Sequence, residues 1–264
     1  MTGSGAPENA TPALPEELPL EGGPDRLFAG SDWPRPFAFN AEVAGVFDDM
    51  VRRSVPLYEG VTRGAARWAL GFSRPGTAVY DLGCSTGTTL GLIAPVAHPG
   101  IRLFGVDRSA AMIDRAREKL RDQPVQLICA DILDVPLVRP SVVIMNYTLQ
   151  FLPVAQRHGL IRRIHAALEP GGLFFLSEKV RFADPGLQEM VTALYEEFKR
   201  DQGYSRTEIE RKKEALDQVL TPLTEGETRQ MLEDAGFSTV ESVARWNNFL
   251  SLVAVKGRDH AASV

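Results

Sequence analysis

The chain has 264 residues, of which 44% are hydrophobic and 24% charged, and its formal net charge is −5. These values are typical of a globular protein with a sizeable core, and the net charge argues against an overall basic surface for nucleic acid. No apolar run is long enough to cross a membrane, and no basic segment followed by an apolar one predicts a secretory signal. Two cysteines, Cys84 and Cys129, are too few for a metal cluster and predict reduced thiols in a cytoplasmic protein.

The N-terminal part divides into a tail and a helical cap. Residues 1–35 are rich in Pro, Gly, Glu and Ala, which predicts a disordered tail. Apolar residues at helical spacing from Val43 to Val51 predict a first helix, and Pro56 near the start of the next stretch predicts a second that ends at about Phe72. These cap helices, within 41–72, could cover a ligand crevice or only pack against the domain, and the spacing favours neither.

From Thr77 onward the sequence alternates between strands and helices. Strands are predicted over 79–82, 102–106, 125–129, 142–145 and 173–177, with helices over 88–97, 110–121 and 155–168. Two charged helices follow, over about 188–202 and 207–219, and form an insertion at 184–220. A helix over 225–234 and strands over 238–245 and 249–256 complete the chain. The pattern predicts one α/β domain over 36–257, with a seven-stranded, mostly parallel sheet, an antiparallel C-terminal hairpin and a short tail at 258–264.

The first strand runs directly into a glycine turn, Asp81-Leu-Gly-Cys-Ser-Thr-Gly87. A strand, a glycine-rich turn and a helix in that order are typical of a nucleotide-cofactor crevice. The turn lacks the three glycines of a dinucleotide site, and an acid directly before it suits a cationic ligand. This pattern is typical of S-adenosylmethionine (SAM) enzymes with the Rossmann-like methyltransferase fold.

The ends of the predicted strands carry side chains suited to successive parts of SAM. The backbone of residues 83–85 is expected to meet the methionine portion, and Asp107 to accept both ribose hydroxyls. Asp131 is expected to accept from the adenine amino group, with Ile132 over a ring face, and Asn146 to lie near the sulfonium. Taken singly, Asp107 could instead be a helix cap, but with the glycine turn ahead of it, polar residues at successive strand ends together predict SAM binding.

No methyl-acceptor chemistry is evident from the sequence. After Asn146 the chain reads Tyr-Thr-Leu-Gln-Phe151, which is not the Asn/Asp-Pro-Pro-Tyr/Phe motif of base-amino methyltransferases. The histidines are not at strand ends and are interpreted as structural: His98, His158, His165 and His260. We therefore assign no catalytic residue.

Five stretches together carry a narrower resemblance: Val46–Tyr58, Tyr80–Ser85, Asn146–Leu152, Leu176–Lys179 and Phe198–Ser205. From about residue 37 to residue 256 the chain resembles the carboxy-S-adenosyl-L-methionine synthase family. The resemblance implies a homodimer that converts SAM and prephenate into carboxy-SAM and phenylpyruvate, through a sulfonium ylide that captures carbon dioxide. It also implies that a separate enzyme uses the product to modify a wobble uridine of tRNA, so that this chain need not bind nucleic acid.

Positions that match the family imply a cofactor site formed by Tyr58, Gly83, Cys84, Ser85, Asp107, Arg108, Asp131, Ile132 and Asn146. The family's arginine for the new carboxylate is replaced by Lys213, which keeps the charge but lacks the bidentate fork. Arg211 could assist Lys213, or the basic run Arg211-Lys-Lys213 could be a solvated helix face. The alternatives are a SAM-dependent methyltransferase of a small molecule and a non-enzymatic SAM-binding or tRNA-associated protein. Lys179, Arg200 and Arg245 are candidate cations for prephenate.

Overall fold

Seven strands form one mixed sheet in the computed structural model, which describes residues 12–30, 37–217 and 219–258. The strand order is β3-β2-β1-β4-β5-β7-β6. The strands are β1 (Ala78–Leu82), β2 (Arg102–Asp107), β3 (Val125–Cys129), β4 (Pro140–Asn146), β5 (Leu173–Lys179), β6 (Thr239–Trp246) and β7 (Phe249–Val255). All pairs among β1–β5 are parallel, and β7 is antiparallel to both β5 and β6. The predicted fold class is confirmed.

The helices of the described residues begin and end close to the predicted positions. They are α1 (Ala41–Ser54), α2 (Tyr58–Phe72), α3 (Thr88–Ile93), α4 (Ala110–Lys119), α5 (Val154–Ala167), α6 (Pro185–Asp201), α7 (Arg206–Asp217) and α8 (Glu225–Asp234). Side-chain caps fix several starts: Asn40 accepts from the Val43 amide, and Ser109 accepts from the Met112 amide. No helix in the described part of the chain is both long and apolar enough to cross a lipid bilayer.

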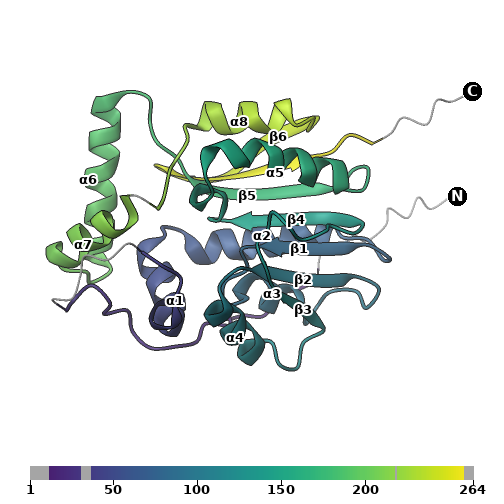
Figure 1. Ribbon diagram of the computed structural model, residues 1–264, viewed down its shortest axis with the longest axis horizontal. Coiled ribbons are helices and arrows are strands. Elements are labelled where there is room, and N and C mark those ends of the chain that lie inside the picture. The colour runs from purple at the N-terminus through teal and green to yellow at the C-terminus, as the bar shows by residue number, and fades with distance from the viewer. Residues whose placement is uncertain (1–11, 31–36, 218, 259–264) are drawn as a thin grey trace, which may run out of the picture.

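Helices cover both faces of the sheet because successive strand residues point to opposite sides. Val79 and Ile144 face the cluster that includes α2, α3 and α4, whereas Tyr80 and Met145 face the cluster that includes α5 and α8. The remaining helices, α1, α6 and α7, gather at one end of the sheet, where α6 projects beyond the strands (Figure 1). The carboxyl ends of β1–β5 therefore face a helical cover built from the cap and the insertion.

The expected tail does not behave as predicted. Residues 12–30 form a segment, here called the strap, that packs along the domain, so the prediction of disorder is wrong for them. Leu14 and Leu18 contact the core under α2 and α3, and Phe28 is only 1% exposed. These scattered apolar residues bury enough surface to order a stretch whose composition favours disorder. Residues 1–11 and 31–35 of the predicted tail, and 259–264 at the other end, lie outside the described residues.

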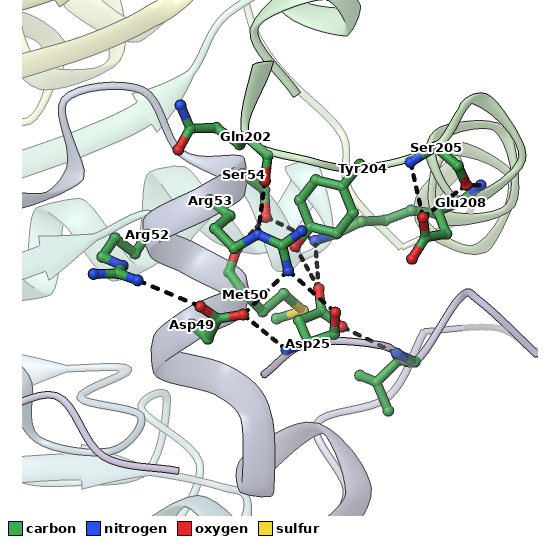
Figure 2. Close-up of polar contacts among 12 residues, drawn as sticks. Asp25, Asp49, Met50, Arg52, Arg53, Ser54, Gln202, Tyr204, Ser205 and Glu208 are labelled. Carbon is green, nitrogen blue, oxygen red and sulfur yellow. Dashed lines mark hydrogen bonds and ion pairs between the residues drawn. The ribbon is translucent and has the colours of Figure 1, made fainter. Parts of the chain in front are cut away.

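A polar cluster joins the strap to α1 and α7 (Figure 2). The Asp25 carboxylate is buried and accepts a hydrogen bond from the Tyr204 hydroxyl. Its backbone carbonyl accepts from the Arg53 guanidinium at 3.1 Å, and its amide donates to Asp49 at 2.8 Å. The Arg53 guanidinium also lies over the Tyr204 ring, 4.2 Å from its centroid. Residues from three distant parts of the sequence are thus held at one point.

Candidate functional site

A cavity of about 450 Å³ opens at the carboxyl ends of the parallel strands, under α1, α6 and α7. This is where an open α/β sheet binds its ligands. All predicted cofactor positions line it: Tyr58, Gly83, Cys84, Ser85, Asp107, Arg108, Asp131, Ile132, Asn146 and Lys213. Residues of α1 and the start of α2 also line it, so of the two interpretations of the cap helices the structure favours a cover over the crevice.

The glycine turn after β1 has the tight geometry that its sequence predicted. Gly83 has φ +80°, and a Cβ at this position would lie 2.3 Å from side-chain atoms of Thr148. The amides of Gly83 and Cys84 both donate to the Val106 carbonyl, at 2.7 and 3.0 Å. Burial raises the pKa of the Cys84 thiol, so this side chain stays protonated and offers no thiolate nucleophile. The turn therefore contributes backbone to the cavity.

Carboxylates dominate the side of the cavity formed by β1, β2 and β3. Asp81 is buried at the end of β1, where burial and the nearby Asp107 raise its pKa to about 7. The Asp107 carboxylate accepts from the amides of Ser85 at 3.0 Å and Ser109 at 2.9 Å, which leaves acceptor positions for ligand hydroxyls. Asp131 caps its own turn by accepting from the Leu133 amide. We call these three aspartates the acidic side, and a ligand that carries positive charge and hydroxyls matches it.

Asn146 ends β4, in the middle of the cavity wall. Its Oδ1 atom is buried and has no hydrogen-bond partner within the described part of the chain. A buried acceptor without a partner costs free energy unless a ligand or water satisfies it. The unsatisfied amide oxygen is therefore consistent with a donor group on a bound ligand, and the residues present suit SAM.

Four lysines form the opposite, basic side, on β5, α6 and α7: Lys179, Lys199, Lys212 and Lys213. Lys213 forms an ion pair with Glu196 at 3.3 Å, and Glu196 and Asp217 also line the cavity. Arg211 instead donates to the strap carbonyls of Phe28 and Gly30, so the expectation that it assists Lys213 in the cavity is wrong.

Of the three cations proposed for prephenate, only Lys179 lines the cavity. Arg200 lies on the exposed side of α6, and Arg245 pairs with Glu225. Lys199, Lys212 and Tyr195 also line the cavity, and the sequence pattern did not predict them as site residues. The signal that could have found the α6 residues is a polar stripe at helical spacing, which lines the cavity: Gln188, Thr192, Tyr195 and Lys199.

A buried ion pair between α1 and α4 is hydrogen-bonded to the glycine turn. Lys119 of α4 lies 2.6 Å from the Asp48 carboxylate of α1, and both side chains are 2% exposed. Lys119 also donates to the hydroxyls of Thr86 and Thr88, each at 3.1 Å. The Asp48 carboxylate accepts further bonds from Thr86 and from the Glu21 amide of the strap. This network connects the cap, the strap and the turn.

The comparisons with known proteins define the class. A methyltransferase-domain family model matches residues 79–172. A magnesium protoporphyrin IX methyltransferase from Synechocystis, solved with bound S-adenosylhomocysteine, has a TM-score of 0.56 at 16% identity and covers 79% of this chain and 87% of that one. A chain from the complex of the Haloferax volcanii Trm112 activator with a methyltransferase has a TM-score of 0.60 at 18% identity, covering 86% and 100%. The chain has the Rossmann-like methyltransferase fold.

Curated relatives narrow this class to one family. A carboxy-S-adenosyl-L-methionine synthase from Trichodesmium erythraeum is 49% identical over 250 residues, 93% of this chain and 99% of that protein. Proteins of the same name from Marinobacter nauticus and Geobacter sp. strain M21 are 43% and 44% identical, over 94% and 83% of this chain and 98% and 93% of their own. The chain belongs to the carboxy-S-adenosyl-L-methionine synthase family.

Proposed function

We propose that this protein binds SAM and, using prephenate as the second substrate, forms carboxy-SAM and phenylpyruvate. The observation that carries the proposal is that every position assigned to the cofactor by resemblance lines one cavity, in a chain 49% identical to a named synthase over nearly its full length. The acidic side suits the ribose and the cationic groups of SAM. The basic side suits an anionic substrate and the carboxylate of the product.

The proposed reaction balances without any further reactant. The bond between the prephenate ring and its carboxylate breaks, and the released carbon dioxide forms a new bond to the methyl carbon of SAM. That methyl group loses one proton, the ring loses its hydroxyl as hydroxide, and the two combine as water while the ring becomes aromatic. Bound SAM supplies a sulfonium that acidifies its methyl protons. The protein aligns the two reactants and excludes water under α1, α6 and α7.

The cellular role that we infer is supply of a carboxymethyl donor. A separate enzyme would use it for the 5-oxyacetyl modification of a wobble uridine in tRNA, so this chain has no need to bind nucleic acid, in keeping with its net charge of −5. Both Cys84 and Cys129 are free thiols, which supports a reducing, cytoplasmic location.

A homodimer is part of the same proposal. Leu187, Met190 and Leu194 lie on one face of α6 and are 57%, 60% and 39% exposed. An exposed apolar helix face of this kind is typical of a protein interface. Sedimentation velocity at micromolar concentration should give a dimer, and Met190→Glu should shift it toward monomer; a wild-type monomer would rule this out.

The decisive assay is mass spectrometry of the reaction with SAM and prephenate. We expect a nucleoside product heavier than SAM by the mass of carbon dioxide, together with equimolar phenylpyruvate. Omitting prephenate should abolish the product. If the protein instead gives S-adenosylhomocysteine at a rate set by an added methyl acceptor, the small-molecule methyltransferase alternative replaces this proposal.

A further inference from the structure

Two lysines of the basic side share one aromatic ring. The Nζ atoms of Lys179, at the end of β5, and Lys199, on α6, lie 4.7 and 4.4 Å from the centroid of the Tyr195 ring. The ring is fixed in place because its hydroxyl donates to the Ser54 carbonyl at 2.8 Å and it packs against Phe249, with centroids 5.1 Å apart. Both ammonium groups are therefore held against one ring in the cavity lining.

The four lysines of the basic side differ in their counter-ions. Lys212 lies 3.8 Å from Asp25, and Lys213 lies 3.3 Å from Glu196. Within the residues that the structure describes, no carboxylate lies at ion-pairing distance from Lys179 or Lys199. Lys199 is only 5% exposed, so water replaces a counter-ion poorly there. Because neither lysine has a carboxylate partner there, a bound dianion would stabilise the ammonium form of both.

The position of this pair relative to the acidic side separates two ligands. Asp81 and Asp107 lie at the ends of β1 and β2 and Asp131 follows β3, all on one side of β4 in the sheet, whereas Lys179 ends β5 on the other side. Asn146 ends β4 between them. A cation bound on the acidic side leaves the lysine pair free for a second, oppositely charged molecule in the same cavity.

We propose that Lys179 and Lys199, organised by Tyr195, form the binding site for the carboxylates of a dianionic second substrate. The inference rests on the proposed function for the identity of that substrate. The pair also accounts for release, because the second substrate gives up one carboxylate in the reaction and leaves as a monoanion that two lysines hold less well. The new negative charge is then on the cofactor, within reach of the remaining basic side.

The test measures binding without turnover. S-adenosylhomocysteine, which lacks the transferable methyl group, is bound first, and prephenate or phenylpyruvate is then titrated by calorimetry. We expect Lys179→Gln and Lys199→Gln each to weaken prephenate about tenfold or more and phenylpyruvate much less. Arg200→Gln, the same charge change one residue along α6 but on its exposed side, should alter neither affinity more than about twofold.

A second measurement follows the protons that Lys179 and Lys199 take up when prephenate binds. Burial lowers the pKa of Lys199 to about 7 and that of Lys179 to about 8. The other charged groups facing the pair are Lys212 and Lys213 on α7 and Glu196 on α6. From α1, the contact with α6 is made by the uncharged Ser54 carbonyl, which accepts from Tyr195. A bound anion favours the ammonium forms, so prephenate binding at about pH 8 should take up protons, and its affinity should fall as the pH rises further. Lys199→Gln should reduce the uptake.

The outcomes separate this site from the reaction. Unchanged prephenate affinity in both lysine variants, with S-adenosylhomocysteine still bound, overturns the lysine site and leaves the synthase reaction standing. Wild-type protein that binds prephenate through these lysines but forms no carboxy-SAM overturns the reaction and leaves the anion site standing.

Discussion

Lys213 is the residue at which this chain departs from the arginine that the family resemblance implies. Its side chain is 62% exposed and its ammonium group pairs with Glu196, which also lines the cavity. To contact the carboxylate of carboxy-SAM, Lys213 must exchange one carboxylate for another. An ammonium group can do this as a point charge, whereas a guanidinium would hold its partner through two parallel hydrogen bonds. We therefore expect a weaker but more easily exchanged contact with the product carboxylate in this chain.

The corresponding prediction compares two ligands in one variant. Lys213→Ala should weaken carboxy-SAM about tenfold, because a charge-assisted contact contributes roughly 1.5 kcal/mol at the exposed end of its range, and should leave SAM nearly unchanged. Lys213→Arg serves as the matched control and should bind carboxy-SAM at least as tightly as the wild type. Calorimetry with both ligands checks this, and an equal loss for SAM and carboxy-SAM would show that Lys213 does not contact the added carboxylate.

At the scale of elements, α1 and α4 are joined under the glycine turn by the Asp48–Lys119 pair. Their attraction offsets the cost of removing two charges from water, but only while both partners are present. The hydroxyls of Thr86 and Thr88 add hydrogen bonds to the ammonium group, so the pair also fixes the turn that lines the cavity. Stability and cavity geometry therefore depend on the same contact.

Removing one member should cost more than removing both. We expect Lys119→Met to lower the free energy of unfolding by about 3–5 kcal/mol, because the Asp48 carboxylate stays buried without its cation. Asp48→Asn combined with Lys119→Met should recover part of that loss. Urea unfolding followed by circular dichroism measures both, and Arg117→Met, which removes an exposed cation from the same helix, should cost less than about 1 kcal/mol. Similar values for the two helix variants would mean that the buried pair contributes little.

The sequence predicted the sheet, its helices and the acidic side because these depend on local patterns: alternation, caps, glycine turns and acids at strand ends. It missed contacts between distant residues. Asp48 and Lys119 are 71 positions apart, and nothing near either one predicts that they meet. The composition of the strap predicted disorder, but contacts of a few apolar residues and of Asp25 hold the strap against the domain. Lys199 was missed because cavity-facing and solvent-facing charges on α6 look alike until the helix is placed.

For the whole molecule, the strap decides how firmly the cover sits over the cavity. Asp25 accepts from Tyr204, which precedes α7, and lies near Lys212 within α7. The Arg53 guanidinium of α1 joins the strap carbonyl to the Gln202 carbonyl after α6. The cap and the insertion, which come from opposite halves of the chain, are thereby held together across the cavity.

Loosening the strap should change amide hydrogen exchange only in the segments that it contacts. Asp25→Asn should increase amide hydrogen exchange in α7 and the end of α1, because Lys212 loses its nearby carboxylate, while β1 and β4 keep their protection. Glu17→Gln changes an exposed strap residue by the same charge and should leave exchange in α7 unaltered. Mass-spectrometric exchange measures all four segments. Unchanged protection of α7 in the Asp25 variant would mean that the strap does not stabilise the cover.

The strap also imposes an order on folding during synthesis. Asp25 leaves the ribosome early, but Tyr204 follows 179 residues later, so their contact cannot form until most of the chain has been made. The parallel strands β1, β2 and β4, which carry Asp81, Asp107 and Asn146 at or near their ends, are complete well before that point. Until then the contact of Phe28 with α7 cannot form, so the strap stays undocked from the insertion. The chain can acquire the parallel part of its sheet, β1–β5, before it acquires a closed cavity.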